Sequence, residues 1–587
     1  MEELGKQMVG YCAGLPLAIR VLGGLLATKH TLRQWRMVAE NIQTYITKGS
    51  GYGEDCSAVS DVLSLSYDDL LPHLKQCFLY LGHFPEDYEI SVDKLIKFWI
   101  ADGIVPSNQD IGRGQGRTLE DVAESCLEEL VGRSMVMVDT SELSSKIFSC
   151  RMHDIMRDLC LLKAEREGFL HVINPESQEP NGEVPSSPYA GEFRRVAVHV
   201  NRVKGEKVFN QGWIRSPHLR SLLYFNRIVN YISADNRNWK LLEPSFKGLK
   251  LLRVLDLEGA DIKGGNFPRD VGKLIHLRFL SIKDGNVSRF PSSLGNLRML
   301  QTLDLRVYDA HVPDVIWKME SLRHLYLPQR CDDTTRLQLG NLKNLQTLVN
   351  FQVGICCLRD LFNFTNLRKL TVHRCSISKG SKEIIPASLS HSLKLLESLS
   401  LGGSFEFGAT ESSLKPKPPK VDLTQLLLGY DSLSKLVLYL GIEKLPDYQQ
   451  FPHEITSLTL GVSKLEEDPM PILEKLPKLR HLDLRWNAFN VRKIVCSRQG
   501  FPQLISLSLF VLKNLEEWKM EEGAMLNIQY LQISVCNKLK RLPSAIRFAK
   551  TLKQLTIQGM PKAFKDRLVE GGEAFYIVQH VPSIISD

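Results

Sequence analysis

The sequence predicts an α/β leucine-rich-repeat solenoid preceded by a mainly helical region with a winged-helix domain. Three observations predict this fold class. The phrase L-x-x-L-x-L recurs from residue 219 almost to the end, with most successive starts 22 to 25 residues apart. The first 170 residues show helical spacing of apolar residues. Two alternating segments, 135–138 and 147–152, flank a polar turn and predict a hairpin after three helices.

Composition limits the classes of partner. The chain has 587 residues with 74 Lys and Arg against 66 Asp and Glu, a net charge of +8 that is mild over this length. Twelve scattered cysteines without a C-x-x-C pair predict reduced, intracellular usage and no metal site. We expect no secretory leader and no transmembrane segment, hence a cytoplasmic location or attachment to the plasma membrane through partners.

Residues 1–50 form the first predicted domain, and residues 51–170 form the second. A break at Gly14-Leu15-Pro16 separates two helices, and Pro16 suits the first turn of the second helix. In the winged-helix domain, one helix is expected to bury Leu74, Cys77, Phe78 and Leu81. Ser91 is expected to cap the next helix, and Thr118 to Asp121 form a capping box before the third.

The third helix argues against DNA as a partner. Winged helices that read DNA need exposed basic or amide side chains on a recognition helix. This helix instead carries carboxylates, which would repel a phosphate backbone: Glu120, Asp121, Glu124, Glu128 and Glu129.

The segment Met152-His153-Asp154 joins a predicted strand to a predicted helix whose apolar face contains Ile155, Leu159 and Leu162. Backbone N–H groups and the positive end of the helix dipole converge at such a junction, so His153 could help to hold a phosphate. The alternative is that His153 and Asp154 only cap the helix.

Residues 171–192 are predicted to be a linker, and the solenoid is predicted to span residues 193–587. Leucines of each repeat should point inward, while the intervening strand residues face the concave side. Two columns of outward residues are candidate protein contacts, and the alternative is a solvated face. The arginine column contains Arg253, Arg278, Arg323, Arg368 and Arg480, and the second column contains Phe279, His324, Tyr326, His481 and Tyr530.

Several segments together resemble one family. These segments are Gly14 to Ala18, the stretch from Val62 to Leu70, the stretch from Leu74 to Tyr80, Phe84 to Asp87, and Met152-His153-Asp154. They resemble, in order, motifs of plant intracellular disease-resistance proteins of the coiled-coil NB-ARC leucine-rich-repeat (NLR) family. The resemblance covers nearly the whole chain, including the repeats.

The resemblance implies roles for particular residues. Residues 1–50 would be the C-terminal remnant of the NB-ARC helical subdomain. His153 would contact the β-phosphate of ADP, Met152 and Asp154 would shape the turn, and Pro16 would lie near the nucleotide. The lysine loop G-x-x-x-x-G-K-[ST] does not occur in the sequence, so we expect an N-terminally truncated chain that is not an enzyme and binds ADP or ATP poorly alone.

By this resemblance, the repeats sense a pathogen effector or a guarded host protein and gate an ADP/ATP-dependent switch together with the chain's own upstream coiled-coil and nucleotide-binding region. The alternatives are a non-enzymatic interaction scaffold, such as a substrate adaptor of a ubiquitin ligase, and an autonomous NTPase, which the absent lysine loop disfavours.

Overall fold

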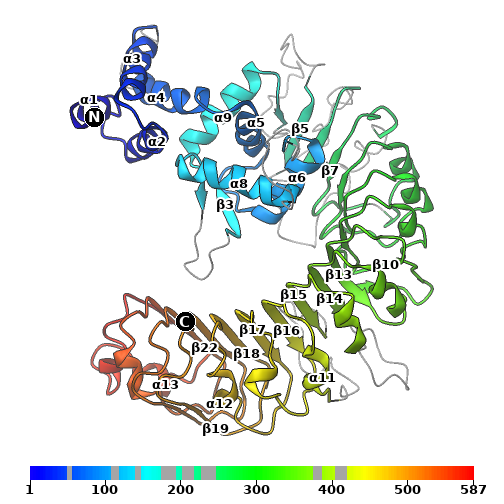
Figure 1. The fold of residues 1–587 in the computed structure, drawn as a ribbon, viewed down its shortest axis with the longest axis vertical. Coiled ribbons are helices and arrows are strands. Elements are labelled where there is room, and N and C mark those ends of the chain that lie inside the picture. Colours follow the sequence, from blue (N-terminus) through cyan, green and yellow to red (C-terminus); the bar gives the residue numbers. More distant parts are fainter. Residues whose placement is uncertain are drawn as a thin grey trace. The chain divides into compact units, whose positions relative to one another are not determined.

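The computed structural model describes residues 1–48, 56–106, 118–138, 147–173, 193–200, 217–226, 246–262, 264–373, 387–402 and 420–586. The chain forms two compact units, Met1–Val307 and Tyr308–Asp587 (Figure 1). The sequence also predicts a connector at Gly112 to Gly116 and an exposed loop at Lys415 to Lys420. The connector and most of the loop lie outside the described residues.

Unit 1 begins with a small helical cluster. It consists of α1 (Glu2–Gly10), α2 (Pro16–Ala27), α3 (Leu32–Lys48) and α4 (Cys56–Asp68), with α2 and α3 packed against α4. Pro16 is the first residue of α2, as predicted, and Gly14 allows the preceding turn because its φ is +74°. Met8, Leu22 and Val62 belong to the shared apolar core of this cluster.

The winged-helix domain follows, as predicted. Helices α5 (Pro72–Tyr80), α6 (Val92–Asp102) and α8 (Leu119–Gly132) pack with an antiparallel sheet in the order β1-β3-β2. The predicted hairpin is formed by β2 (Met137–Val138) and β3 (Ser149–Arg151). The first strand, β1 (Ile90–Ser91), was not predicted because two residues are too short to show a period.

The two predicted helix caps have different outcomes. The Thr118 side chain accepts a hydrogen bond from the Asp121 amide at 3.2 Å, and the Asp121 carboxylate accepts one from the Thr118 amide at 2.7 Å, which confirms the capping box. Ser91 precedes α6, but its side chain makes no capping hydrogen bond, so that prediction is wrong. Ser91 is held instead by strand pairing with Ser149.

Helix α9 (Asp154–Arg166) begins at the predicted position but buries a different face. Leu159 is buried as expected, whereas Ile155 and Leu162 are 36% and 41% exposed. Met156 and Cys160 take their places in the core, since α9 packs against α5 and the short helix η1 (Leu81–His83). Apolar residues occur on both faces of this helix, so periodicity alone could not identify the buried one.

The solenoid part of unit 1 is a parallel sheet whose strands pair in chain order. Strand β4 (His171–Ile173) lies inside the predicted linker, so the predicted linker start at residue 171 is wrong. It pairs with β5 (Arg195–Val200). Strand β5 is buried at every residue, because the next strand pairs with it and the winged-helix helices also contact it. The remaining strands are β6 (Ser221–Asn226), β7 (Val254–Asp256), β8 (Phe279–Ser281) and β9 (Thr302–Asp304).

Unit 2 continues the repeat with the alternation that the leucine phrase predicts. In β16, β17 and β18, Leu436, Leu458 and Leu482 are paired neighbours and point inward, while the residues between leucines are partly exposed. The main parallel strands of this unit are β11 (His324–Tyr326), β13 (Thr347–Gln352), β14 (Lys369–His373), β15 (Ser398–Leu401), β16 (Lys435–Tyr439), β17 (Ser457–Gly461), β18 (His481–Arg485), β20 (Ser506–Phe510), β22 (Tyr530–Ser534), β23 (Gln554–Gln558) and β24 (Ser583–Ser586).

Short elements close the other side of each repeat. Pro268 and Pro291 precede η3 (Arg269–Lys273) and η4 (Ser292–Asn296) in unit 1, and Pro543 precedes η10 (Ser544–Phe548) in unit 2. Two additional ladders, β10 (Asp309–Ala310) with β12 (Arg330–Cys331) and β19 (Lys493–Cys496) with β21 (Glu517–Met520), were not predicted because the leucine phrase does not include them.

We predict that Leu458→Ala destabilises unit 2 by about 2–5 kcal/mol, since it removes a fully buried side chain from the leucine stack. Thr459→Ala in the same strand is the matched control, because Thr459 is partly exposed and should change stability by no more than about 0.5 kcal/mol. Thermal unfolding of the full chain measures both effects. Equal shifts for the two variants would contradict the inward assignment of the leucines.

Candidate functional site

The Met152-His153-Asp154 turn lies between the end of β3 and the start of α9. Met152 is 7% exposed and anchors the turn in the winged-helix core, whereas Asp154 is exposed. His153 is half-buried, and its Nδ1 accepts a hydrogen bond from the Ile155 amide at 3.4 Å. The predicted position of His153 at a helix N-terminus is therefore confirmed, and its side chain does cap the helix.

The geometry of this turn is compatible with one phosphate group. The Ile155 amide donates its hydrogen bond to the ring of His153. The carbonyl of His153 accepts a hydrogen bond from the amide of Arg157 at 2.9 Å. The first-turn amides of a helix have no partner within the helix, and the helix dipole favours an anion near them. Pro16 is the first residue of α2. Helix α2 packs against α4, and α4 also contacts α9.

An aromatic contact joins the winged-helix domain to the first repeats within unit 1. The ring of Phe98, on α6, packs edge-on against Phe279, on β8, with centroids 4.7 Å apart. Phe84 and Tyr88 each lie 5.5 Å from the ring of Phe225, on β6. These rings and the residues around them belong to one continuous apolar core. The helices and the repeats are thus packed as parts of one folded body.

This contact corrects the prediction for Phe279. Its position on the strand is outward, as the repeat phrase predicts, but its side chain is only 2% exposed because Phe98 covers it. Phe279 is therefore not available to another protein in this arrangement. The sequence could not show this, because nothing in the repeat phrase indicates which outward residues a neighbouring domain covers.

A buried ion cluster lies beside the aromatic pair. The ammonium of Lys94, on α6, contacts Asp256 and Glu258 at 2.5 Å each, and Lys283 contacts Glu258 at 2.7 Å. The Asp256 side chain is 1% exposed, and those of Lys94 and Glu258 are 21% and 25% exposed. Lys94 also lies 5.4 Å from the centre of the Phe98 ring. One cation of the winged-helix domain therefore holds two carboxylates of the solenoid.

The two carboxylates respond differently to this environment. Burial raises the pKa of Asp256 to about 6, although Lys94 opposes the shift. Burial also acts on Glu258, but Lys94 and Lys283 outweigh it and lower its pKa to about 2. For Lys94, burial is outweighed by Asp256 and Glu258, and its pKa is raised. Glu258 is thus the principal counter-ion of the cluster.

A second set of polar contacts holds the end of α6. Asp102 is buried and pairs with Arg195 at 2.5 Å, and its carbonyl accepts a hydrogen bond from Arg253 Nη1 at 2.7 Å. Gly103 ends the helix with φ +81°, and a side chain there would approach Arg253 Nη1 to 3.2 Å. Arg253 of the predicted arginine column therefore caps the negative end of α6.

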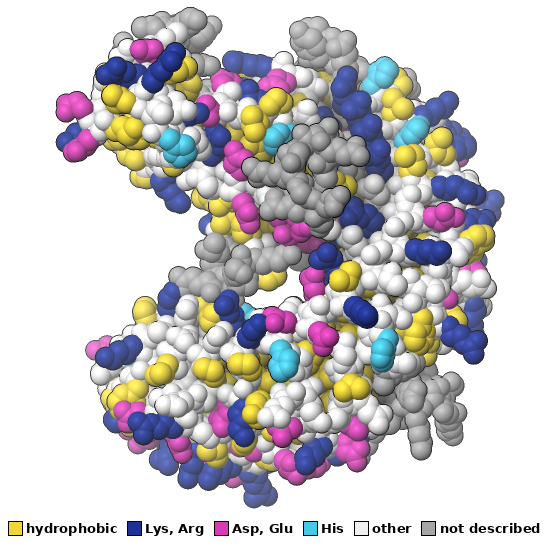
Figure 2. Space-filling model, viewed as in Figure 1, with side chains coloured by type: hydrophobic (Ala, Val, Ile, Leu, Met, Phe, Trp, Pro, Cys, Tyr) yellow, Lys and Arg dark blue, Asp and Glu magenta, His cyan; other side chains and the backbone are white. Residues whose placement is uncertain are grey.

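The candidate contact residues of unit 2 differ in exposure. Arg480 is exposed, His481 is half-buried, and Arg368 forms an ion pair with Glu397 at 2.7 Å. Arg323 is half-buried, but His324 and Tyr326 are 6% and 5% exposed, so their predicted exposure is wrong. The ring of His324 lies 3.1 Å from Thr347 Oγ1 on the adjacent strand. Figure 2 shows acidic and basic side chains interspersed over the viewed face of this unit.

Among the described residues, no cluster of three or more His, Cys, Asp or Glu side chains could hold a metal ion. No helix in the same part of the chain has the length and apolar content needed to cross a bilayer.

Comparison with known proteins agrees with this architecture. A family model described as "Leucine-rich repeat region" matches residues 218–561, and one described as "Disease resistance protein Winged helix domain" matches residues 84–160. The chain belongs to the leucine-rich-repeat proteins, and its homologues are plant disease-resistance proteins.

Several Arabidopsis thaliana relatives of this leucine-rich-repeat protein match along nearly its whole length. It is 41% identical to probable disease resistance RPP8-like protein 2 over 592 aligned residues, covering 99% of this chain and 61% of the relative. It is 40% identical to probable disease resistance protein RXW24L and to disease resistance protein RPP8, covering 100% of this chain and 61% of each relative. The chain thus spans about three-fifths of the length of these relatives.

For the ion cluster of this leucine-rich-repeat protein, we predict that Glu258→Gln loosens α6 more than Asp256→Asn. Gln removes the carboxylate that both lysines use and should lower the opening free energy of α6 by about 1–3 kcal/mol. Asn removes a carboxylate whose charged form burial already disfavours, so its effect at neutral pH should be smaller. Hydrogen exchange of the α6 amides in the full chain measures both variants.

The pH dependence provides an independent check of the same two variants. The pKa of folded Asp256 lies above the ordinary value of 3.8, so its stabilising contribution is complete below pH 3.8 and is lost as the pH rises through about 6. The pKa of folded Glu258 lies below 4.5, so its contribution is present above pH 4.5 and is lost towards pH 2. Each variant should remove the corresponding change, and profiles identical to the parent chain would contradict the assignment.

Proposed function

We propose that this chain is part of a plant immune receptor in which the repeats sense a pathogen effector, or a host protein that an effector has altered. In this proposal, the winged-helix domain transmits the state of the repeats to a nucleotide-binding region. The homology to plant disease-resistance proteins supports the immune role. The observation that carries the proposal is the buried contact of α6 with β7 and β8 through Phe98 and Lys94.

This contact is suited to coupling two domains. A ligand of the repeats can change the conformation of another region only if it binds two states of the chain with different affinities. Separating α6 from β7 and β8 costs free energy, because it would expose Phe279 and remove Lys94 from the carboxylates of Asp256 and Glu258. A partner that binds the repeats better in the separated state would therefore weaken the restraint on the winged-helix domain.

The nucleotide part of the proposal concerns Met152, His153 and Asp154. ADP and ATP are the cofactors expected for this kind of receptor, and the turn at the start of α9 offers amide donors and the His153 ring to one phosphate group. ADP and ATP differ in negative charge, because ATP carries one more phosphate group. Within this chain, Met152 anchors the turn, Asp154 stabilises the helix start, and His153 and Pro16 are the proposed nucleotide contacts.

We predict that Asp154→Val increases immune output without a trigger when the chain is joined to the upstream region of a relative such as RPP8. Valine removes the carboxylate from the first turn of α9 and loosens the turn that presents His153. Ion leakage from leaf tissue that expresses the fusion measures the output, with the protein level checked by immunoblot.

Asp158→Val is the matched control for this experiment, because Asp158 is also exposed on α9 but lies one turn further along. The control should retain trigger-dependent output. If Asp154→Val also leaves the output unchanged, the turn does not act in the switch, and a plain interaction scaffold becomes the better description of the chain.

A further inference from the structure

The first strands of the solenoid place arginines side by side at one register position. Arg194, Arg220, Arg253 and Arg278 each precede a strand, and pairing of Ser221 with Val254 and of Val254 with Phe279 aligns the last three. The amide of Arg253 donates to the carbonyl of Arg220, and the amide of Arg278 donates to that of Arg253. Adjacent members of this arginine row are therefore separated by about one strand spacing, roughly 4.8 Å.

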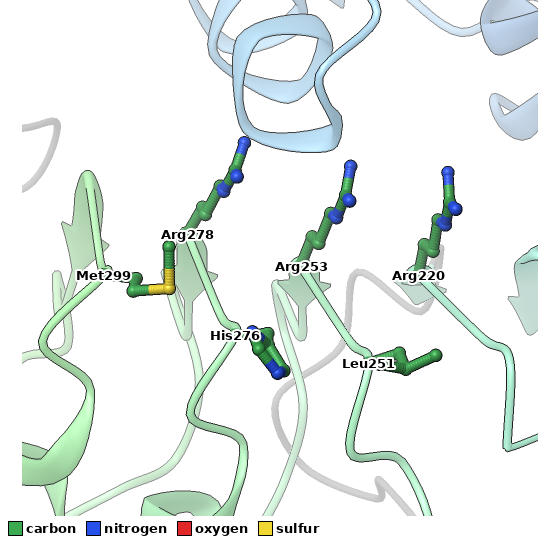
Figure 3. Close-up of a pocket in the computed structure, with 6 residues that line it drawn as sticks. All are labelled: Arg220, Leu251, Arg253, His276, Arg278 and Met299. Carbon is green, nitrogen blue, oxygen red and sulfur yellow. The ribbon is translucent and has the colours of Figure 1, made fainter.

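Three of these side chains extend in the same direction. Figure 3 shows Arg220, Arg253 and Arg278 extending in parallel from neighbouring strands, with His276, Leu251 and Met299 around their bases; Arg253 and Arg278 end beneath a helical turn, and Arg220 lies to one side of it. The six residues line a pocket of about 150 Å³. Figure 2 shows Lys and Arg side chains gathered on the surface around these first strands.

In the part of the chain that the structure describes, Asp102 is the carboxylate that acts on Arg220 and Arg253, and it is already paired with Arg195. Arg253 uses one of its N–H groups on the carbonyl of Asp102. Within the described ranges, Arg220 and Arg278 have no carboxylate in ion-pair contact, although both are half-buried. Burial lowers the pKa of the Arg220 and Arg253 guanidinium groups, and the charges of neighbouring arginines lower it further.

The same register position in unit 2 lacks this accumulation of charge. Arg368 is neutralised by Glu397, and Arg480 is exposed to solvent. Like charges on directly adjacent strands destabilise a sheet. A row of three half-buried arginines therefore has a cost that a bound anion would offset, whereas a single exposed arginine has no such cost.

We propose that Arg220, Arg253 and Arg278 form a binding site for a small anion that carries two or more phosphate groups. Guanidinium groups recognise phosphate oxygens through paired N–H donors, and each retains donors that the protein does not use. Arg220 and Arg278 arise two strand spacings apart, roughly 10 Å, so two anionic groups can satisfy the row better than one. The small volume and the helical turn facing the arginines favour a compact ligand over an extended acidic peptide.

Isothermal titration of the full chain with inorganic tripolyphosphate, without divalent cations, tests the proposal. We expect saturable binding that weakens about tenfold or more for each of Arg220→Gln and Arg278→Gln, since each removes a charge-assisted contact. Arg278→Lys should give an intermediate loss, because it keeps the charge but not the fork. Thermal unfolding without ligand confirms that each variant is folded.

Arg480→Gln is the matched control, because it removes the same charge at the same repeat position but outside the pocket. Its affinity should stay within twofold of the parent chain. Absence of saturable binding, or an equal loss in Arg480→Gln, would overturn the site. A loss in His153→Ala without a loss in Arg220→Gln would assign the binding to the α9 turn instead. Binding of a phosphoserine peptide, but not of tripolyphosphate, would overturn the small-anion assignment in favour of a protein partner.

Discussion

The contact of Lys94 with Asp256 and Glu258 is the interaction on which the organisation of unit 1 depends. Asp256 is almost fully buried, and a carboxylate in that position is tolerated only when a cation lies beside it. The cation comes from α6, and the aromatic ring one turn further along the same helix, Phe98, covers Phe279. Charge neutralisation and apolar burial therefore require the same placement of one helix on two strands.

This placement changes the role of the repeats beside it. In the later strands of unit 2, outward residues alternate with buried leucines and are partly exposed, as in β16 and β17. In unit 1, β7 and β8 are buried at every residue. The first repeats thus serve mainly as a docking surface for the winged-helix domain, and the outward face of the later repeats remains accessible to solvent at positions such as Arg480.

Helix ends organise the polar chemistry of unit 1. The N-terminus of α9 presents amides and the ring of His153, whereas the C-terminus of α6 presents carbonyls, one of which receives Arg253. The opposite signs of the two helix ends explain why an anion suits the first position and an arginine suits the second. The arginine row beside α6 has more positive charge than the carbonyls of that helix end and Asp102 require, because Asp102 is already paired with Arg195.

The sequence by itself determined the repeat fold, the winged-helix hairpin, the start of α9 at Asp154 and the capping box at Thr118. These features depend on periodicity and on hydrogen bonds between residues close in the chain, which local patterns record. Arg220 directly follows Leu219, the first leucine of an L-x-x-L phrase, so the sequence also allowed it to be placed in the arginine column.

Only the tertiary structure decided which outward residues are covered. Phe279, His324 and Tyr326 are buried, β4 pairs with β5 inside the expected linker, and α9 buries Met156 and Cys160 in place of Ile155 and Leu162. The same holds for Lys94, which lies more than 150 residues before the carboxylates that it neutralises. Contacts over such separations depend on how whole elements pack, and no local spacing of residues encodes that choice.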